Sequence, residues 1–279
     1  MKSDWIILCS ELKKAVWNHL IFVICAAMIL ALLSMGFISE CISDAREMGG
    51  TAAEDFSLVI PFVATPFSIF VAALSSITLA VDYERGYVKL LLSLPVPKRA
   101  VLLSKFLVSV VDSMIFYSIL VGQYVLMWSA SGMKLGETMP TCVLISYAIT
   151  LAFIVCAISI GFIASVVFRN GLRALSTVIT VLVLYFTVTD VFSSYKLMTL
   201  RIGEAERYIA LIDLSPMHVV SNAIDLINLK ITYRPDSPAL QIIKPYLLAL
   251  TTVGTLPNVI IAVVLLICAI ILFIKNETP

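Results

Sequence analysis

Long apolar runs dominate the chain and alternate with short polar segments. A helix that spans a membrane needs about 20 mostly apolar residues, because the hydrocarbon layer is about 30 Å thick and each helical residue rises about 1.5 Å. Helices are expected because lipid offers no other partner to backbone N–H and C=O groups. Six runs fit, the last one slightly short but almost wholly aliphatic: 20–39, 57–81, 106–130, 143–168, 174–192 and 257–274. The pattern predicts an all-α, polytopic membrane protein with six transmembrane helices, forming a single transmembrane domain over 1–279.

The composition agrees with this prediction. Of the 279 residues, 61% are hydrophobic and only 13% are charged, whereas soluble domains are about 45–50% apolar and about 25% charged. A globule of this size could not bury the excess, so lipid must be part of the solvent. The net charge of +1 gives no sign of the clustered basic surface that nucleic-acid binding needs.

The basic residues predict the orientation. If the N-terminus is cytoplasmic, the inner segments carry eleven Lys and Arg, whereas the two short outer loops carry only Arg46 and Lys134. Cytoplasmic loops carry the excess of positive charge, and long connections such as 193–256 count little. We therefore expect a multi-pass protein of the cell (cytoplasmic) membrane with both termini in the cytoplasm.

The first segment, 1–19, predicts an interfacial helix. Trp5, Leu8 and Leu12 recur at three- and four-residue steps, while most charged residues point elsewhere. Such a helix lies in the membrane plane with its tryptophan at headgroup level. The alternative is a plain cytoplasmic extension of the first span.

The connection between the fifth and sixth spans, 193–256, is too long for a structureless loop. Residues 204–213 and 216–229 predict short helices, and 238–254 is apolar enough to lie against the membrane or dip into it. Pro257 is expected to restart the chain for the last span. These pieces could cap the exit of a path through the membrane.

The richest polar stretch lies between the second and third spans. Asp82 and Glu84 open it, where negative charge suits the start of a helix, and Pro95 and Pro97 end it, because proline lacks an N–H and disfavours helix in the residue before it. The sequence therefore predicts a rigid cytoplasmic helix over 82–99. Physical chemistry alone leaves open whether a soluble partner docks on it or whether it is a stiff loop with snorkelling basic residues.

This stretch resembles the corresponding segment of type-2 ATP-binding-cassette (ABC) transporter permeases, the six-helix exporter-type family. The residues that carry the resemblance are Glu84, Gly86, Leu90 to Leu92, Ser93-Leu94-Pro95-Val96-Pro97, Lys98-Arg99 and Lys105-Phe106. The wider layout agrees along essentially the whole chain: an interfacial N-terminal helix, six spans, both ends inside and a long last connection.

The resemblance implies that 82–99 is a coupling helix seated in a groove of a separate P-loop ATPase subunit. Two ATPase copies would serve two permease copies, the second permease being an identical or a related chain. The implied ATPase-docking residues are Asp82, Tyr83, Glu84, Arg85, Gly86, Lys89, Pro95, Pro97, Lys98 and Arg99.

The function implied is that of a membrane-spanning permease subunit of an ABC transporter, an exporter in most of the family, which forms the translocation path. The chain is not expected to be an enzyme or to bind a cofactor, because none of its eleven glycines is followed by lysine and a P-loop is therefore absent. ATP and magnesium would be bound by the partner subunit.

The sequence also bears on three other functional classes. An intramembrane enzyme lacks support, because the two histidines, His19 and His218, are far apart and no H-E-x-x-H motif occurs. A secondary transporter or channel would normally show internal repeats or several charges at mid-membrane. A non-transporting membrane assembly factor stays open, and the sequence does not reveal the substrate.

Two polar residues of the third span are candidates for a path or for interhelical contacts. Asp112 should face protein or water, because charge in lipid is costly. It either lines a polar path, answers a basic residue such as Lys105 or Arg173, or is hydrated near the interface. Gln123 is better explained as an interhelical hydrogen-bonding group than as a substrate contact.

Three further features allow alternatives. The turn from Arg169 to Arg173 is explained by inside positive charge or by a second ATPase contact. The small residues from Ser68 to Thr78 favour close helix packing, either with a second copy or within the chain. The six cysteines lack the spacing of a metal or dithiol motif, although Cys41 and Cys142, on the same outer side, could pair.

Overall fold

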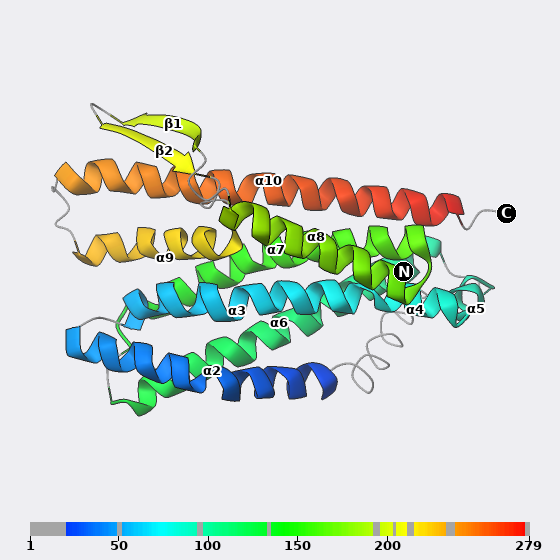
Figure 1. Ribbon diagram of the computed structural model, residues 1–279, viewed down its shortest axis with the longest axis horizontal. Helices are drawn as coiled ribbons and strands as arrows, with labels where there is room; N and C mark the ends of the chain where they lie inside the picture. The colour runs from blue at the N-terminus through cyan, green and yellow to red at the C-terminus, as the bar shows by residue number, and fades with distance from the viewer. Residues whose placement is uncertain are drawn as a thin grey trace.

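A computed structural model describes residues 21–48, 52–93, 97–132, 135–191, 196–202, 205–210, 215–232 and 238–276. The expected interfacial helix 1–19 lies outside the described residues. The long helices run side by side along the long axis of the molecule (Figure 1). Their bounds are α2 Ile21–Met48, α3 Ala52–Ser76, α4 Thr78–Glu84, α5 Tyr87–Ser93, α6 Lys98–Ala130, α7 Met139–Phe168, α8 Gly171–Val191, α9 Pro216–Thr232 and α10 Pro238–Asn276.

Within the described residues, five helical stretches are long and apolar enough to cross a membrane, which confirms a polytopic helical membrane protein. They are Val23–Glu47, Asp55–Glu84 (most of α3 together with α4), Lys98–Ala130, Met139–Phe168 and Ile243–Lys275. The expected fifth span, 174–192, overlaps α8, in which Gly171–Tyr185 is an apolar helix within the described residues. Several helices extend past the apolar runs, because hydropathy marks the part in lipid and not the end of the hydrogen-bonded helix.

The core lies where α3, α6 and α7 pack together. Trp128, Tyr124 and Phe56 are among its largest fully buried side chains. The Tyr124 hydroxyl lies 2.9 Å from an Asp55 carboxylate oxygen and 3.0 Å from the Ala52 carbonyl oxygen, which joins α6 to the first turn of α3. Large apolar side chains of α2 and α10 are exposed outwards, as expected where lipid covers a helix.

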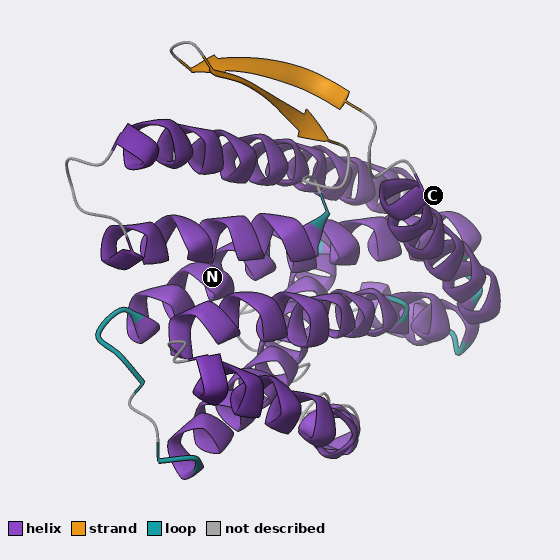
Figure 2. Ribbon diagram, turned by 60° about the vertical axis from the view of Figure 1, so that its left-hand side comes forward, coloured by secondary structure: helices purple, strands orange, loops and turns teal. Residues whose placement is uncertain are grey.

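The first part of the long connection before the last span differs from the prediction. The short helix expected over 204–213 is wrong: Ala205–Ala210 is strand β2, paired antiparallel with β1, Lys196–Ile202. Thr199 lies opposite Tyr208, and β-branched and aromatic residues favour strands over short helices. The hairpin lies beside α10 (Figures 1 and 2).

The last helix also corrects a prediction, because Pro257 does not restart the chain. Helix α10 runs for 39 residues through both Pro245 and Pro257, so 238–254 and 257–274 are two parts of one helix. Proline is tolerated in a membrane helix when neighbouring groups satisfy the freed backbone.

Helix α9 matches the helix expected over 216–229, but it lies inside the bundle. Ser215 precedes its first turn, with its hydroxyl oxygen 2.9 Å from Nδ1 of His218, and Pro216 takes the first helical position, as is usual at helix starts. The helix packs against α3, α7 and α10 and buries Val219 and Ile224 completely. The connection therefore fills part of the bundle and is not only an outer cap.

Candidate functional site

The segment between α3 and α6 consists of two short helices, α4 and α5, and not of the single helix expected over 82–99. Gly86 separates them with a φ of 70°, a left-handed conformation that glycine adopts without steric cost. The Gly86 N–H donates to the Tyr83 carbonyl at 3.1 Å, which closes α4, and its carbonyl accepts from Leu90, which opens α5. We call residues 78–93 the α4–α5 segment.

The described docking candidates divide by exposure. Glu84, Arg85, Lys89, Pro97 and Arg99 are exposed, Tyr83, Gly86 and Lys98 are half-buried, and Asp82 is buried. Pro95 lies outside the described residues. Leu90 is 61% exposed, although it is not among the docking residues that the resemblance implies. Exposure of one leucine within a leucine run depends on how the helix packs, so no local signal in the sequence identifies it.

Asp82 is buried because it pairs with Lys105. The Lys105 ammonium group at the start of α6 donates to the Asp82 carboxylate of α4, and both side chains are buried. The same ammonium group lies 6.0 Å from the centre of the Tyr87 ring. Lys105 therefore forms its ion pair with Asp82 and not with Asp112. Asp82 fixes the α4–α5 segment on α6 and does not contribute to an exposed surface.

The turn between α7 and α8, residues 169–171, packs against α4. Arg169 has a φ of 50°, and its guanidinium lies 5.3 Å from the centre of the Tyr83 ring. A Cβ atom at Gly171 would lie 3.0 Å from Cγ2 of Val81 and 3.5 Å from a carboxylate oxygen of Glu84. The turn and the α4–α5 segment therefore form one continuous structure at this end of the bundle (Figure 1).

A second contact joins α7 to the point where α3 gives way to α4. The Ser165 hydroxyl of α7 donates to the Ser76 carbonyl at 3.2 Å, while the Ala80 and Val81 N–H groups both donate to Ile77. The Ser76 side chain occupies the space that a Cβ atom of Gly161 would need. The small residue Ser76, at the end of α3, therefore allows close packing on α7 within the same chain.

Gln123 and Asp112, the two polar candidates of the third span, both lie in α6. The Gln123 amide donates to the Ala31 carbonyl at 2.6 Å and accepts from the Ser34 hydroxyl at 3.5 Å, so it joins α6 to α2. Asp112 is buried, with 3% of its surface exposed, and Arg173 is exposed on α8.

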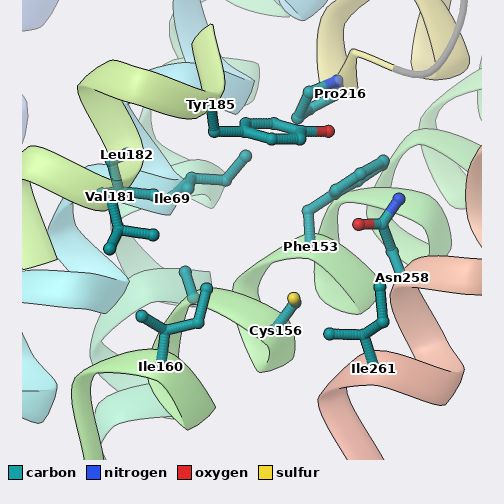
Figure 3. A pocket seen from close by; sticks show the side chains of 11 residues that line it. Ile69, Phe153, Cys156, Ile160, Val181, Leu182, Tyr185, Pro216, Asn258 and Ile261 are labelled. Atoms are coloured by element: carbon teal, nitrogen blue, oxygen red, sulfur yellow. The ribbon is translucent and has the colours of Figure 1, made fainter. Parts of the chain in front are cut away.

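An apolar cavity of about 170 Å³ lies between α8 and α10, over α7. Figure 3 shows Tyr185 and Leu182 of α8 on one side, Asn258 and Ile261 of α10 on the other, and Cys156 of α7 between them. No Lys, Arg, Asp or Glu is among its lining residues. The cavity can therefore accept an apolar group but not a charged one.

Metal and disulfide chemistry are not found in the described part of the chain. It contains no cluster of three or more His, Cys, Asp or Glu side chains that could hold a metal ion. Cys41 and Cys142 are not joined by a disulfide, so the pairing that the sequence allowed is not formed.

The comparisons with known proteins gave one match. Residues 5–278 match the family model described as "ABC-2 family transporter protein". A search of curated proteins found no match.

Proposed function

The chain belongs to the ABC-2 transporter family and is a type-2 ABC transporter permease, and from this premise we propose that its α4–α5 segment docks on a separate P-loop ATPase whose nucleotide cycle drives export. Family membership favours this function over the two alternatives that the sequence allowed, a secondary transporter or channel and a non-transporting assembly factor. The substrate would pass through the helical bundle, and ATP and magnesium would be bound by the ATPase subunit alone.

The observation that carries the proposal is the exposed surface of the α4–α5 segment. Leu90, 61% exposed, lies beside exposed Lys89, with exposed Glu84 and Arg85 at the preceding turn. Interfaces gain most of their free energy from a few apolar or aromatic anchors, and a charged rim around them contributes specificity. An exposed leucine close to exposed charges fits the groove of a soluble partner.

A docking element also has to keep its conformation when the partner moves it. The buried pair of Asp82 and Lys105 fixes α4 on α6, and Gly86 sets the angle at which α5 follows. A displacement of the segment would therefore reach the spans without being lost in a flexible loop. In this scheme the nucleotide state of the ATPase selects between two arrangements of the bundle.

The proposed assembly has two permease copies and two ATPase copies in the cell membrane, with both permease termini in the cytoplasm. The eleven Lys and Arg on the side of the α4–α5 segment support this orientation. The exposed apolar faces of α2, including Leu32 and Leu33, offer surface both to lipid and to a second permease copy.

Co-purification tests the docking. The full chain carries an affinity tag, is expressed in its native cells and is purified in mild detergent, and a co-purifying P-loop ATPase is identified by mass spectrometry. The wild type should retain the ATPase, and Glu84→Arg with Leu90→Asp should lose most of it. Glu137→Arg, a matched charge reversal at an exposed residue of another connection, should retain it. The proposal fails if the double variant holds the ATPase as well as the wild type does, or if the wild type holds none.

A further inference from the structure

We infer that the turn between α7 and α8 relays movement of the α4–α5 segment to α8, so that the apolar cavity between α8 and α10 changes width with the nucleotide state of the ATPase. Arg169 and Gly171 are the positioning residues of this relay. The inference rests on the proposed docking and adds to it a route through the membrane domain and an apolar site that responds.

The first step of the relay is the contact between α4 and the turn. The Arg169 guanidinium lies over the Tyr83 ring at 5.3 Å, within the range of a cation–π interaction. Gly171, the first residue of α8, leaves no room for a Cβ atom without displacing Val81. Close-packed contacts transmit displacement because they leave no slack. A shift of α4 therefore has to move the start of α8.

The second step is the lever formed by α8 itself. From Gly171 to Tyr185 the helix extends for about 21 Å at 1.5 Å per residue. Among the described helices, α8 packs along this length mainly on α7 and, at its inner end, on α4, whereas α10 packs on both α7 and α9. Of the two walls of the cavity, α8 is therefore the one that can tilt.

The third step is the cavity. Leu182 and Tyr185 of α8 face Asn258 and Ile261 of α10 across it, and the Cys156 thiol lies on its floor (Figure 3). A tilt of α8 about its inner end changes the gap between the walls. The lining accepts an alkyl or aryl group and excludes charge, so the site suits the apolar part of a membrane-dissolved molecule.

One other route has to be distinguished. The ring centres of Tyr83 and Phe273 of α10 lie 6.3 Å apart, edge to face, so α4 also touches the opposite wall of the cavity. This contact lies near the end of α10, which is fixed along its length by α7 and α9. A variant that breaks only the Arg169 contact separates the two routes.

Cys156 provides a native probe for the test. The complex of the full chain with its ATPase is placed in lipid nanodiscs and treated with a small membrane-permeant maleimide, and each cysteine is quantified by peptide mass spectrometry. In the wild type the alkylation rate of Cys156 should differ at least about fivefold between the nucleotide-free and the ATP–vanadate-trapped states. Cys268, which is exposed on α10 and outside the cavity, should react at the same rate in both states.

Arg169→Gly breaks the relay without disturbing the turn, since glycine adopts the φ of 50° more readily than arginine does. The response of Cys156 should fall below about twofold while the ATPase still co-purifies. Arg173→Ala removes an equal charge from an exposed position of the same helix start and should keep the full response, as should Phe273→Leu.

Each other outcome overturns a defined step. If the wild type holds the ATPase but Cys156 reacts equally in both states, the cavity does not respond and the inference is wrong. If Arg169→Gly keeps the full response, the relay runs elsewhere, and loss of the response in Phe273→Leu alone would assign it to α10. If the wild type holds no ATPase, the docking proposal itself fails.

Discussion

Lys105 of α6 donates a hydrogen bond to the carboxylate of Asp82 in α4, and both side chains are buried. Two opposite charges removed from water stabilise a fold only if they compensate each other, and loss of one partner leaves the other uncompensated. The pair therefore specifies how the α4–α5 segment sits on the spans more than it adds stability. This property can be tested apart from any partner protein.

Lys105→Met should lower the free energy of unfolding by about 3–5 kcal/mol, because the buried Asp82 would lose its ion pair with Lys105. The double variant Asp82→Leu with Lys105→Met should recover most of that loss, since two apolar side chains replace two charges. Denaturant unfolding of the purified chain in detergent measures both. Lys89→Met, at an exposed lysine, is the control and should change stability by less than about 0.5 kcal/mol. Strictly additive losses would contradict the pairing.

Gly161→Ala should destabilise the chain by about 1–3 kcal/mol through overpacking. A Cβ atom there would collide with the Ser76 side chain, whose hydroxyl donates to the Ala73 carbonyl at 2.6 Å. Adding Ser76→Gly should restore most of the loss, because it removes the colliding atoms.

Gly122→Ala is the matched control for this prediction. Gly122 is also helical, but a Cβ atom there meets nothing within 4 Å, and alanine should stabilise the helix by about 0.5–1 kcal/mol. Thermal unfolding of Gly161→Ala, Gly161→Ala with Ser76→Gly, and Gly122→Ala beside the wild type measures these changes in stability. Equal effects of Gly161→Ala and Gly122→Ala would show that α3 and α7 do not approach closely.

The long helices could be predicted from the sequence because lipid leaves the backbone almost no alternative. The details of the α4–α5 segment could not. Asp82 looked like an exposed helix-start charge, but it is buried and pairs with Lys105 of α6. A contact between residues 23 positions apart depends on how α4 and α6 pack, which no local pattern records.

Glycine and proline predicted a helix boundary correctly only where the backbone conformation requires that residue. Gly86 marks a real break, because its positive φ excludes most other residues. Pro257 marks none, because it lies within a helix that continues past it. The contact of Gly171 with α4 left no signal in the sequence, since a glycine at a helix start has several common explanations.

Gly86→Ala should lower the free energy of unfolding by about 1–2 kcal/mol, because the left-handed conformation costs an L residue about that much. A Cβ atom at Gly86 meets no other atom within 4 Å, so the effect should come from the backbone alone. Gly86→Asn should cost less than Gly86→Ala, since asparagine tolerates this conformation better. Denaturant unfolding ranks the three proteins, and an alanine variant as stable as the wild type would show that the turn does not need glycine.

The orientation of the α4–α5 segment has one direct test. Lys89 and Glu137 are exposed on different connections of the bundle, and the distribution of basic residues predicts that Lys89 faces the cytoplasm and Glu137 the outside. A membrane-impermeant maleimide should therefore label Glu137→Cys in intact cells and Lys89→Cys only after the membrane is opened. The wild type corrects for the native cysteines. Labelling of Lys89→Cys in intact cells would place the segment away from cellular ATP, and no arrangement of the helices could then link it to a nucleotide-driven partner.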